Sequence, residues 1–284
     1  MIPGLLLKIC QVFGRAVFPP KCLVCKSFFQ PPAVKGGTVS SPSPTADKTS
    51  AWPLILQSEL DRQLSLYLCS DCIRGLVLVE SPICVYCGLP FKSRQGVDHP
   101  CGDCIASPKK FRVARAPLVY EQTLTGVIHC LKYKGKTQLA EPLAELLRTA
   151  FQRFWDQGSI DIVIPVPLHL KRLRERGFNQ AYLLVRKWKT AAGQNNAGLA
   201  DLRIERDVLV RTVSTAPQSV LGRAERAANI KNAFTVKYPD KIWDKRILLI
   251  DDVYTTGATV DECARILLQS GAANVDVLTL ARAV

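Results

Sequence analysis

The fold of this chain is decided by one stretch near its C-terminus, Ile247-Leu-Leu-Ile-Asp-Asp-Val-Tyr-Thr-Thr-Gly-Ala-Thr-Val260. Its first four residues, Ile247–Ile250, are aliphatic and predict a short buried strand. A helix is predicted from about Ala258 to Ser270, where Gly271 ends it. A buried strand that leads through small residues into a helix is typical of a parallel α/β sheet. Open sheets of this kind bind ligands at the carboxyl ends of their strands.

The loop after this strand combines two carboxylates with a cradle for an anion. Small hydroxyl residues and a glycine let backbone N–H groups surround a phosphate, and the N-terminus of the helix adds its positive end. The cradle residues are Thr255, Thr256, Gly257, Ala258 and Thr259. Asp251 and Asp252 fit beside a phosphate if a sugar lies between, because they could accept hydrogen bonds from vicinal ribose hydroxyls. We expect this pair at an exposed loop edge.

Two other phosphate-binding motifs are excluded at this position. A Walker loop would place Gly-Lys-Ser/Thr after the glycine, and a dinucleotide fingerprint would need Gly-x-Gly-x-x-Gly; neither is present. The rest of residues 111–284 alternates short aliphatic runs with helical periods. Strands are predicted at Ala116–Tyr120, Ile160–Val166 and Asn274–Leu280, and helices at 138–157 and 179–190. This alternation predicts a doubly wound, mostly parallel α/β sheet.

The cysteines point to a second, smaller domain. Eight of the eleven form four Cys-x-x-Cys pairs before residue 105: Cys22/Cys25, Cys69/Cys72, Cys84/Cys87 and Cys101/Cys104. This spacing is typical of zinc knuckles, and eight thiolates are enough for two structural Cys₄ zinc sites. Sequential pairing would place Cys22–Cys72 on one ion and Cys84–Cys104 on the other, whereas interleaved pairing is the alternative. We expect a double zinc ribbon over residues 19–107, with a disordered Pro- and Ser-rich insert at 30–53.

Composition and charge narrow the classes of partner. The 284 residues include 38 Lys+Arg against 24 Asp+Glu, a net charge of +14, and 48% are hydrophobic, which excludes a wholly disordered chain. Residues 111–235 hold 20 basic and 10 acidic side chains, a balance of 20 − 10 = +10 that suits a polyphosphate, either nucleic acid or a small phosphorylated ligand. No stretch approaches the ~18–20 apolar residues of a membrane span.

The location of the protein is predicted from its thiols and its first residues. Repeated Cys-x-x-Cys pairs need reduced thiols, which favours the cytoplasm. Residues 1–18 are apolar but contain Lys8 and Arg15, so we expect an amphipathic helix that packs on the protein or lies on a membrane surface. Peripheral association with the inner membrane is therefore an open alternative.

Three segments together resemble the type I phosphoribosyltransferase family. The stretch from Asp251 to Thr259 is similar to its phosphoribosyl-pyrophosphate (PRPP) signature, and Pro165-Val-Pro-Leu168-His169 is similar to its pyrophosphate loop. Arg211–Gln218, followed by Arg223 and Arg226, looks like its mobile loop. Together with the cysteine knuckles, Leu131-Lys-Tyr-Lys-Gly135 and Arg172–Ala181, these segments identify the chain as a member of the ComF family, which includes competence protein F and GntX-like proteins.

The resemblance implies a PRPP site and roles for its residues. Asp251 and Asp252 would bind the ribose hydroxyls and are the expected catalytic residues. Thr255–Thr259 would hold the 5′-phosphate, and the backbone at Leu168 and His169 would hold pyrophosphate with Mg²⁺. Arg223 and Arg226 would close over the ligand. His169 is expected to have a positional role. The chain ends after its last predicted strand, so we expect the acceptor to be covered by the zinc region or by residues 121–136.

Two functions follow from the resemblance. The first is a PRPP-binding protein linked to DNA uptake, competence or nucleotide salvage, in which phosphoribosyl transfer releases pyrophosphate; the sequence shows no obvious general base for an acceptor. The second is a non-catalytic component of DNA uptake, with PRPP as a regulatory ligand. Its zinc ribbons would dock a partner helicase or ATPase, or would bind single-stranded DNA, with the basic residues 171–189, Tyr182 and Trp188 supplying charge and stacking.

Overall fold

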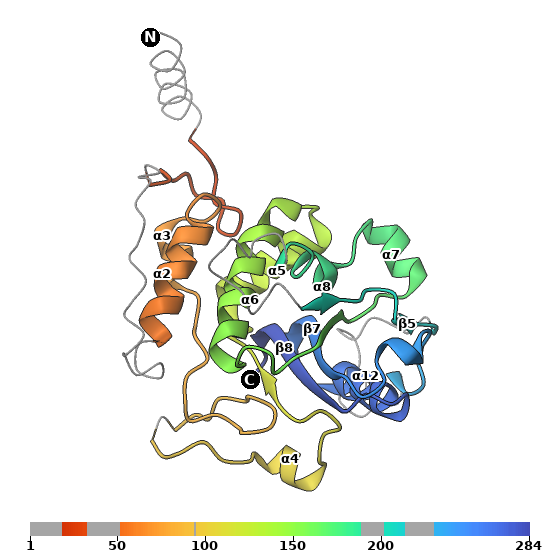
Figure 1. The fold of residues 1–284 in the computed structure, drawn as a ribbon. Coiled ribbons are helices and arrows are strands. Elements are labelled where there is room, and N and C mark those ends of the chain that lie inside the picture. Colours follow the sequence, from red (N-terminus) through yellow and green to blue (C-terminus); the bar gives the residue numbers. More distant parts are fainter. Residues whose placement is uncertain (1–18, 33–51, 94, 189–201, 214–229) are drawn as a thin grey trace.

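A computed structural model describes residues 19–32, 52–93, 95–188, 202–213 and 230–284 (Figure 1). At its centre lies a six-stranded sheet, in the order β1-β8-β7-β3-β4, with β2 also paired to β8. Every ladder of this sheet is parallel. The strands are β1 (Ala114–Arg115), β2 (Leu118–Val119), β3 (Ile162–Pro165), β4 (Arg203–Ile204), β7 (Arg246–Tyr254) and β8 (Asn274–Arg282). The predicted doubly wound α/β fold is confirmed.

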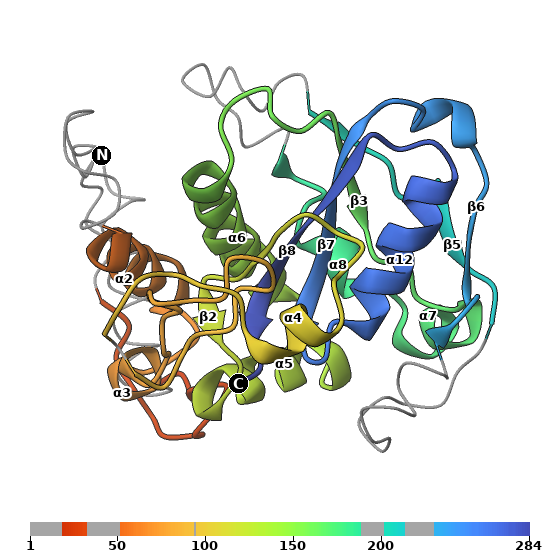
Figure 2. The same ribbon diagram turned by 90° about the horizontal axis from the view of Figure 1, so that it is seen from below.

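Helices cover both faces of this sheet (Figures 1 and 2). One face carries α5 (Gln122–Tyr133), α6 (Ala140–Phe154) and α8 (Gln180–Leu183), and the other carries α12 (Ala258–Gln269). Along β7, Leu248 and Ile250 enter the core beneath α6, whereas Ile247 and Leu249 enter the core beneath α12. A central parallel strand buried on both faces needs apolar residues at every position, which is why this strand is a continuous aliphatic run.

The remaining elements lie around this centre. Strands β5 (Leu209–Arg211) and β6 (Phe234–Val236) form a separate two-stranded antiparallel sheet. The short helix α7 (Leu170–Arg176) follows β3, and two 3₁₀ turns, η1 (Thr137–Leu139) and η3 (Pro239–Lys241), precede α6 and β7. The cysteine region carries α2 (Trp52–Leu64), α3 (Ser70–Arg74) and α4 (Gly102–Ala106).

The cysteine region contributes side chains to the hydrophobic cores on both sides of the sheet. Helix α2 lies against α6, and the buried cysteines Cys22, Cys69 and Cys72 belong to the same core as that helix. The cysteines from Cys84 to Cys104 belong to the core beneath α12. Residues 19–107 and 111–284 therefore share their hydrophobic cores. The division between them near residues 107–111 remains a prediction about the organisation of the chain.

Three predicted elements differ from the structure. The strand predicted at Ala116–Tyr120 is shortened to β2, Leu118–Val119, and β1 pairs with β8 just before the predicted range. Pro117 lies between these two strands and has no N–H for the ladder. Within the described part of the helix predicted at 179–190, α8 covers Gln180–Leu183 and turns follow at 184–187; residues 189 and 190 lie outside the described residues. Trp52 and Pro53, predicted to be disordered, begin α2.

Some predictions lie outside the described residues. These are the amphipathic helix at 1–18, most of the insert at 30–53 and the loop that contains Arg223 and Arg226. Within the described part of the chain, no helix is long and apolar enough to cross a membrane.

Candidate phosphoribosyl site

The two aspartates lie within β7, and the prediction of an exposed loop edge is wrong for Asp252. This residue is 3% exposed, and Asp251 is half-buried. The strand continues to Tyr254 because its ladder with β8 continues, with Asp251 opposite Thr279 and Val253 opposite Ala281. Extension of the strand therefore places both carboxyl groups among packed side chains, where a charge needs a partner.

Side chains from three other elements converge on Asp252. The Nζ of Lys132, near the end of α5, forms an ion pair with its Oδ2. The Nε2 of Gln180, in α8, donates to its Oδ1 at 3.1 Å. Arg176, at the end of α7, donates in turn to Oε1 of Gln180 at 2.6 Å, and its guanidinium lies 5.3 Å from the ring centroid of Tyr133. The tertiary structure thus joins the Leu131–Gly135 and Arg172–Ala181 motifs to the paired aspartates.

The ion pair with Lys132 gives the two aspartates different pKa values. Burial acts to raise the pKa of Asp252, but the charge of Lys132 and its hydrogen bond outweigh burial and leave this pKa below its usual value. Burial and the negative charge of Asp252 together raise the pKa of Asp251 well above its usual value. Asp252 therefore ionises first, and the pair titrates in two separate steps.

The phosphate cradle begins directly after Tyr254. Gly257 has φ +79°, and a Cβ added to it would lie 2.1 Å from the hydroxyl of Tyr254, so only glycine fits this turn. Helix α12 starts at the next residue, so its N-terminus, with its positive end, lies at the carboxyl edge of the sheet, where the N–H of Ala258 donates to Oγ1 of Thr256 at 3.4 Å. The cradle from Thr255 to Thr259 thus has the geometry of an anion site.

The predicted pyrophosphate segment lies beside this cradle. It leaves β3 at Pro165, which pairs with Ile250 of β7, and the N–H of Val166 donates to the carbonyl of Ile250 at 2.8 Å. Leu168 is half-buried. Nδ1 of His169 accepts from the N–H of Lys171 at 3.2 Å and so caps α7. This contact fits the positional role expected for the histidine.

The eight knuckle cysteines form two clusters in sequential order. Within each cluster, the four sulfurs lie within 4.8 Å of one another: Cys22, Cys25, Cys69 and Cys72 in the first, and Cys84, Cys87, Cys101 and Cys104 in the second. Four thiolates at this spacing match the donor set of a structural zinc site, which leaves no open position for catalysis. The structure therefore supports sequential over interleaved pairing.

Comparison with curated proteins places the chain among its relatives. It is 33% identical over 218 residues to the DNA utilization protein YhgH of Escherichia coli, a match that covers 76% of this chain and 90% of the relative. The chain belongs to the ComF family. Competence protein F of Haemophilus influenzae is 29% identical over 223 residues (76% and 90% covered), and competence protein ComFC of Bacillus subtilis is 30% identical over 222 (76% and 84%). No protein-family model matches the chain.

In this ComF-family chain, sequence reasoning missed three residues near the aspartates. Lys132 and Gln180 stand in the motifs that carried the resemblance, yet neither had a predicted role. Arg211, expected at the start of the mobile loop with no role of its own, is the third and lies on β5: burial lowers its pKa, the nearby charge of Arg172 lowers it further, and the charge of Asp251 opposes both. The available signal was a lysine directly after Leu131 and four residues after Ile128, both apolar residues of the same helix.

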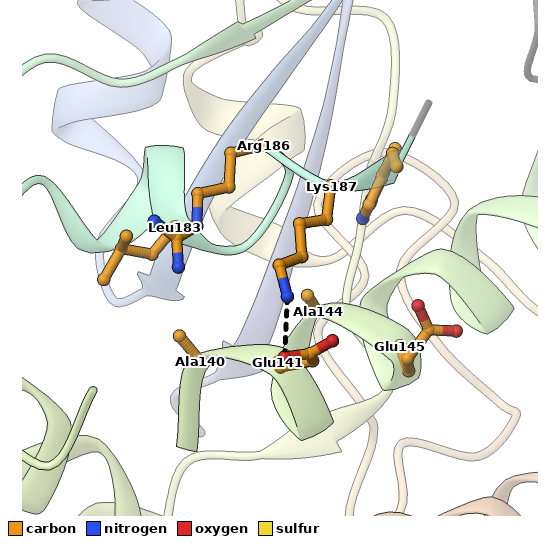
Figure 3. Close-up of a pocket in the computed structure, with 8 residues that line it drawn as sticks. Ala140, Glu141, Ala144, Glu145, Leu183, Arg186 and Lys187 are labelled. Carbon is orange, nitrogen blue, oxygen red and sulfur yellow. Dashed lines mark hydrogen bonds and ion pairs between the residues drawn. The ribbon is translucent and has the colours of Figure 1, made fainter. Parts of the chain in front are cut away.

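The predicted stacking platform for nucleic acid is partly wrong. Trp188 is 1% exposed and packs against Phe151, with ring centroids 5.4 Å apart, so its indole cannot stack on a base. A hollow of about 220 Å³ lies beside it, between α6 and the turn after α8. There the Nζ of Lys187 donates to Glu141 at 2.8 Å (Figure 3), so part of the basic segment is already neutralised. Tyr182 is half-buried, with the guanidinium of Arg206 5.5 Å from its ring centroid.

A larger cavity adjoins the pyrophosphate segment. It has a volume of about 810 Å³, with Leu168 and His169 on one wall and Arg211 and Thr212 of the β5 side on another. Phe178 also lines it. Apolar and aromatic side chains with a few cations are the usual lining of a site for an organic anion.

Proposed function

We propose that this ComF-family protein binds PRPP at the carboxyl edge of β7 and β3 and acts in the uptake or use of DNA. One observation carries the ligand assignment. The glycine turn at Gly257 and the N-terminus of α12 directly follow the strand that ends with Asp251–Tyr254, and they lie beside the predicted pyrophosphate segment after β3. Hydroxyl-binding carboxylates next to an anion cradle match a phosphorylated sugar better than an inorganic phosphate or a nucleic-acid backbone, which would be repelled by the acids.

Each group has a distinct role in this proposal. Asp252, held ionised by Lys132, accepts a hydrogen bond from a ribose hydroxyl, and Asp251 binds the neighbouring hydroxyl. The cradle Thr255–Thr259 holds the 5′-phosphate through backbone N–H groups. The backbone at Leu168 and His169 holds the pyrophosphate group. Arg223 and Arg226, outside the described residues, would close over the bound ligand.

Mg²⁺ is proposed to enter with the ligand. Magnesium sites commonly combine one or two carboxylates with substrate phosphates, and half-buried Asp251 offers an oxygen ligand at this edge of the sheet. Bound there, the ion would neutralise charge on the pyrophosphate. The two cysteine clusters are proposed to hold one structural zinc ion each.

The proposed reaction is phosphoribosyl transfer. The bond between C1 of the ribose and the pyrophosphate oxygen breaks, and the oxygen keeps the electron pair. An acceptor forms a new bond to C1 and releases its proton to solvent. The 810 Å³ cavity beside Leu168 and Arg211 is the proposed place for the acceptor, because it is large enough for a base-sized molecule and contains aromatic surface.

The names of the relatives support the cellular process. Two are named competence proteins and one a DNA utilization protein. They also favour the second candidate, a non-catalytic module in which PRPP regulates contact with single-stranded DNA or a partner ATPase. Exposed cations that such a surface could use are Lys171, Arg174 and Arg186.

Calorimetry with four ligands tests the proposal: PRPP with Mg²⁺, PRPP without it, ribose-5-phosphate and a single-stranded oligonucleotide. We expect PRPP with Mg²⁺ to bind most tightly. Asp251→Asn should weaken that binding roughly ten- to a hundredfold, since a hydrogen bond to a charged group contributes about 1.5–3 kcal/mol. Asp161→Asn, at the opposite end of the sheet, is the matched control and should bind normally. Absence of PRPP binding by the zinc-loaded protein would overturn the assignment.

A second measurement separates the two candidates. Release of pyrophosphate should be followed with PRPP and a panel of bases and nucleotides. Turnover with one acceptor supports the transferase. Tight PRPP binding with no turnover, together with oligonucleotide affinity that changes when PRPP is present, supports the regulatory module.

A further inference from the structure

The last residue of β8, Arg282, connects the second cysteine cluster to the phosphate cradle. Its side chain is buried, with 7% of the residue exposed. On one side, its Nε donates to the carbonyl of Cys87 at 3.2 Å and its Nη2 lies 3.7 Å from the Sγ of the same cysteine. On the other side, its Nη1 donates to the carbonyls of Thr255 at 3.0 Å and Tyr254 at 3.4 Å. One guanidinium therefore contacts both a cluster ligand and the first residue of the cradle.

Tyr254 provides a second contact between Arg282 and the phosphate cradle. The guanidinium carbon of Arg282 lies 4.3 Å from the ring centroid of this tyrosine, and the tyrosine hydroxyl occupies the space that a Cβ on Gly257 would fill. Movement of Arg282 would therefore displace Tyr254 against the glycine turn. The positions of the cradle's first and third residues both depend on where the guanidinium sits.

The cluster itself is held tightly on the sheet. Gly88, which follows Cys87, has φ +65°, and an added Cβ would lie 2.7 Å from the carbonyl of Ala114 in β1. The N–H of Ala114 donates to the carbonyl of Tyr86 at 2.6 Å. Figure 2 shows the end of β8, marked C, beside the coil of the cysteine region. The knuckle thus contacts β1 directly, and β1 is paired with β8.

The net charge of the second cysteine cluster depends on whether the metal is bound, and this charge acts on Arg282. Four thiolates outweigh the charge of one Zn²⁺, so a loaded Cys₄ cluster is a net anion. A buried guanidinium needs compensating negative charge, and within the described part of the chain no carboxylate forms an ion pair with Arg282. The loaded cluster supplies that charge, and a cluster of protonated thiols would not.

We propose that metal occupancy of the second cluster sets the position of the phosphate cradle through Arg282, which acts as a positioning residue. Only the identity of the ligand rests on the proposed function. Loss of the metal would release the guanidinium from Cys87, loosen Thr255 and Tyr254, and lower affinity for a phosphorylated ligand at a site that the metal does not touch. A protein of this design would bind its ligand tightly only when it is zinc-loaded.

The test compares Arg282→Gln with Arg115→Gln in the full-length, zinc-loaded chain. Arg115 donates to the carbonyl of Val85, between two cluster cysteines, and to the carbonyl of Ala114. Among the described residues, it makes no hydrogen bond to Tyr254 or Thr255. Zinc content, hydrogen exchange of residues 253–260 without ligand, and PRPP affinity are measured on each. We expect Arg282→Gln to keep its zinc, to exchange faster in 253–260, and to bind PRPP about tenfold more weakly. Arg115→Gln should leave that exchange unchanged.

The second part of the test removes the metal from one cluster at a time. Cys104→Ser should accelerate exchange in residues 253–260, whereas Cys25→Ser, in the first cluster, should not. Arg282→Lys keeps the charge but cannot reach both Cys87 and Thr255 with one nitrogen, so it should also accelerate exchange, and it serves if the glutamine variant fails to fold. Unchanged exchange in the zinc-loaded lysine variant or in Cys104→Ser would overturn the proposal. If PRPP fails to bind in the unmutated protein, the proposed function fails, but the exchange comparison still decides the coupling.

Discussion

Replacing Lys132 by methionine would leave a charged carboxylate buried without its cation. Asp252 is 3% exposed, and the described residue that pairs with its charge is Lys132. Removal of one partner from a buried ion pair costs about 3–5 kcal/mol of folding free energy. The hydrogen bond from Gln180 would remain, so we expect a loss near the lower end, about 3 kcal/mol.

The loss should depend on pH. In the natural protein the folded-state pKa of Asp252 is lowered, so its contribution to stability is present above the unfolded pKa of about 4 and is lost as the pH falls. Without Lys132, burial is opposed only by the hydrogen bonds with Asp251 and Gln180, and it raises that pKa. The folded state of the variant then binds a proton more tightly than the unfolded state, so its stability declines as the pH rises above about 4. The difference between the two proteins should therefore be larger at pH 8 than at pH 5.

Urea unfolding at these two pH values measures the effect, with thermal melting as a second readout at about 2–4 °C per kcal/mol for a domain of this size. Lys134→Met is the matched control, because Lys134 is an exposed lysine two residues along the same motif. Asp252→Asn and the double variant complete a cycle. Two results would refute the stabilising role of the ion pair. One is that Lys132→Met loses no more stability than Lys134→Met. The other is that the losses of Lys132→Met and Asp252→Asn add up to that of the double variant within about 0.5 kcal/mol.

Three other predictions address the cradle, the metal and acid stability. Gly257→Ala should cost about 1–3 kcal/mol of stability and reduce PRPP affinity, because of its positive φ and the hydroxyl of Tyr254; Tyr254→Phe in the same chain should restore part of both in melts and calorimetry. Anaerobically purified protein should contain two zinc ions, and Cys87→Ser should lose about one; metal analysis without zinc would refute this. Hydrogen bonds from Arg246 lower the pKa of Asp161 to about 2, so its stabilising contribution should disappear as the pH falls from about 4 toward 2. Asp161→Asn should flatten that part of the stability curve in urea titrations, and an unchanged slope would contradict the argument.

Local sequence patterns were enough for the class of fold. The aliphatic run Ile247–Ile250 and the apolar period of 138–157 reflect burial that repeats along one element, and both elements are present as β7 and α6. The Cys-x-x-Cys pairs are equally local, since two thiolates on one turn can bind one ion. Such signals need no knowledge of distant neighbours, and the doubly wound sheet and the two cysteine clusters could be predicted for that reason.

Contacts between distant segments were decided only by the tertiary structure. The sequence predicts Asp252 as an exposed loop residue. In the structure, the ladder with β8 extends β7 past this residue, and Lys132 of α5 forms an ion pair with it. Sequential pairing of the cysteines followed from their placement on opposite faces of the sheet. Arg282 donates to the carbonyl of Cys87, which lies 195 positions earlier in the sequence. Burial and counter-charge are properties of neighbours in space, so a sequence can specify which side chain carries a charge while only the packed fold decides what compensates it.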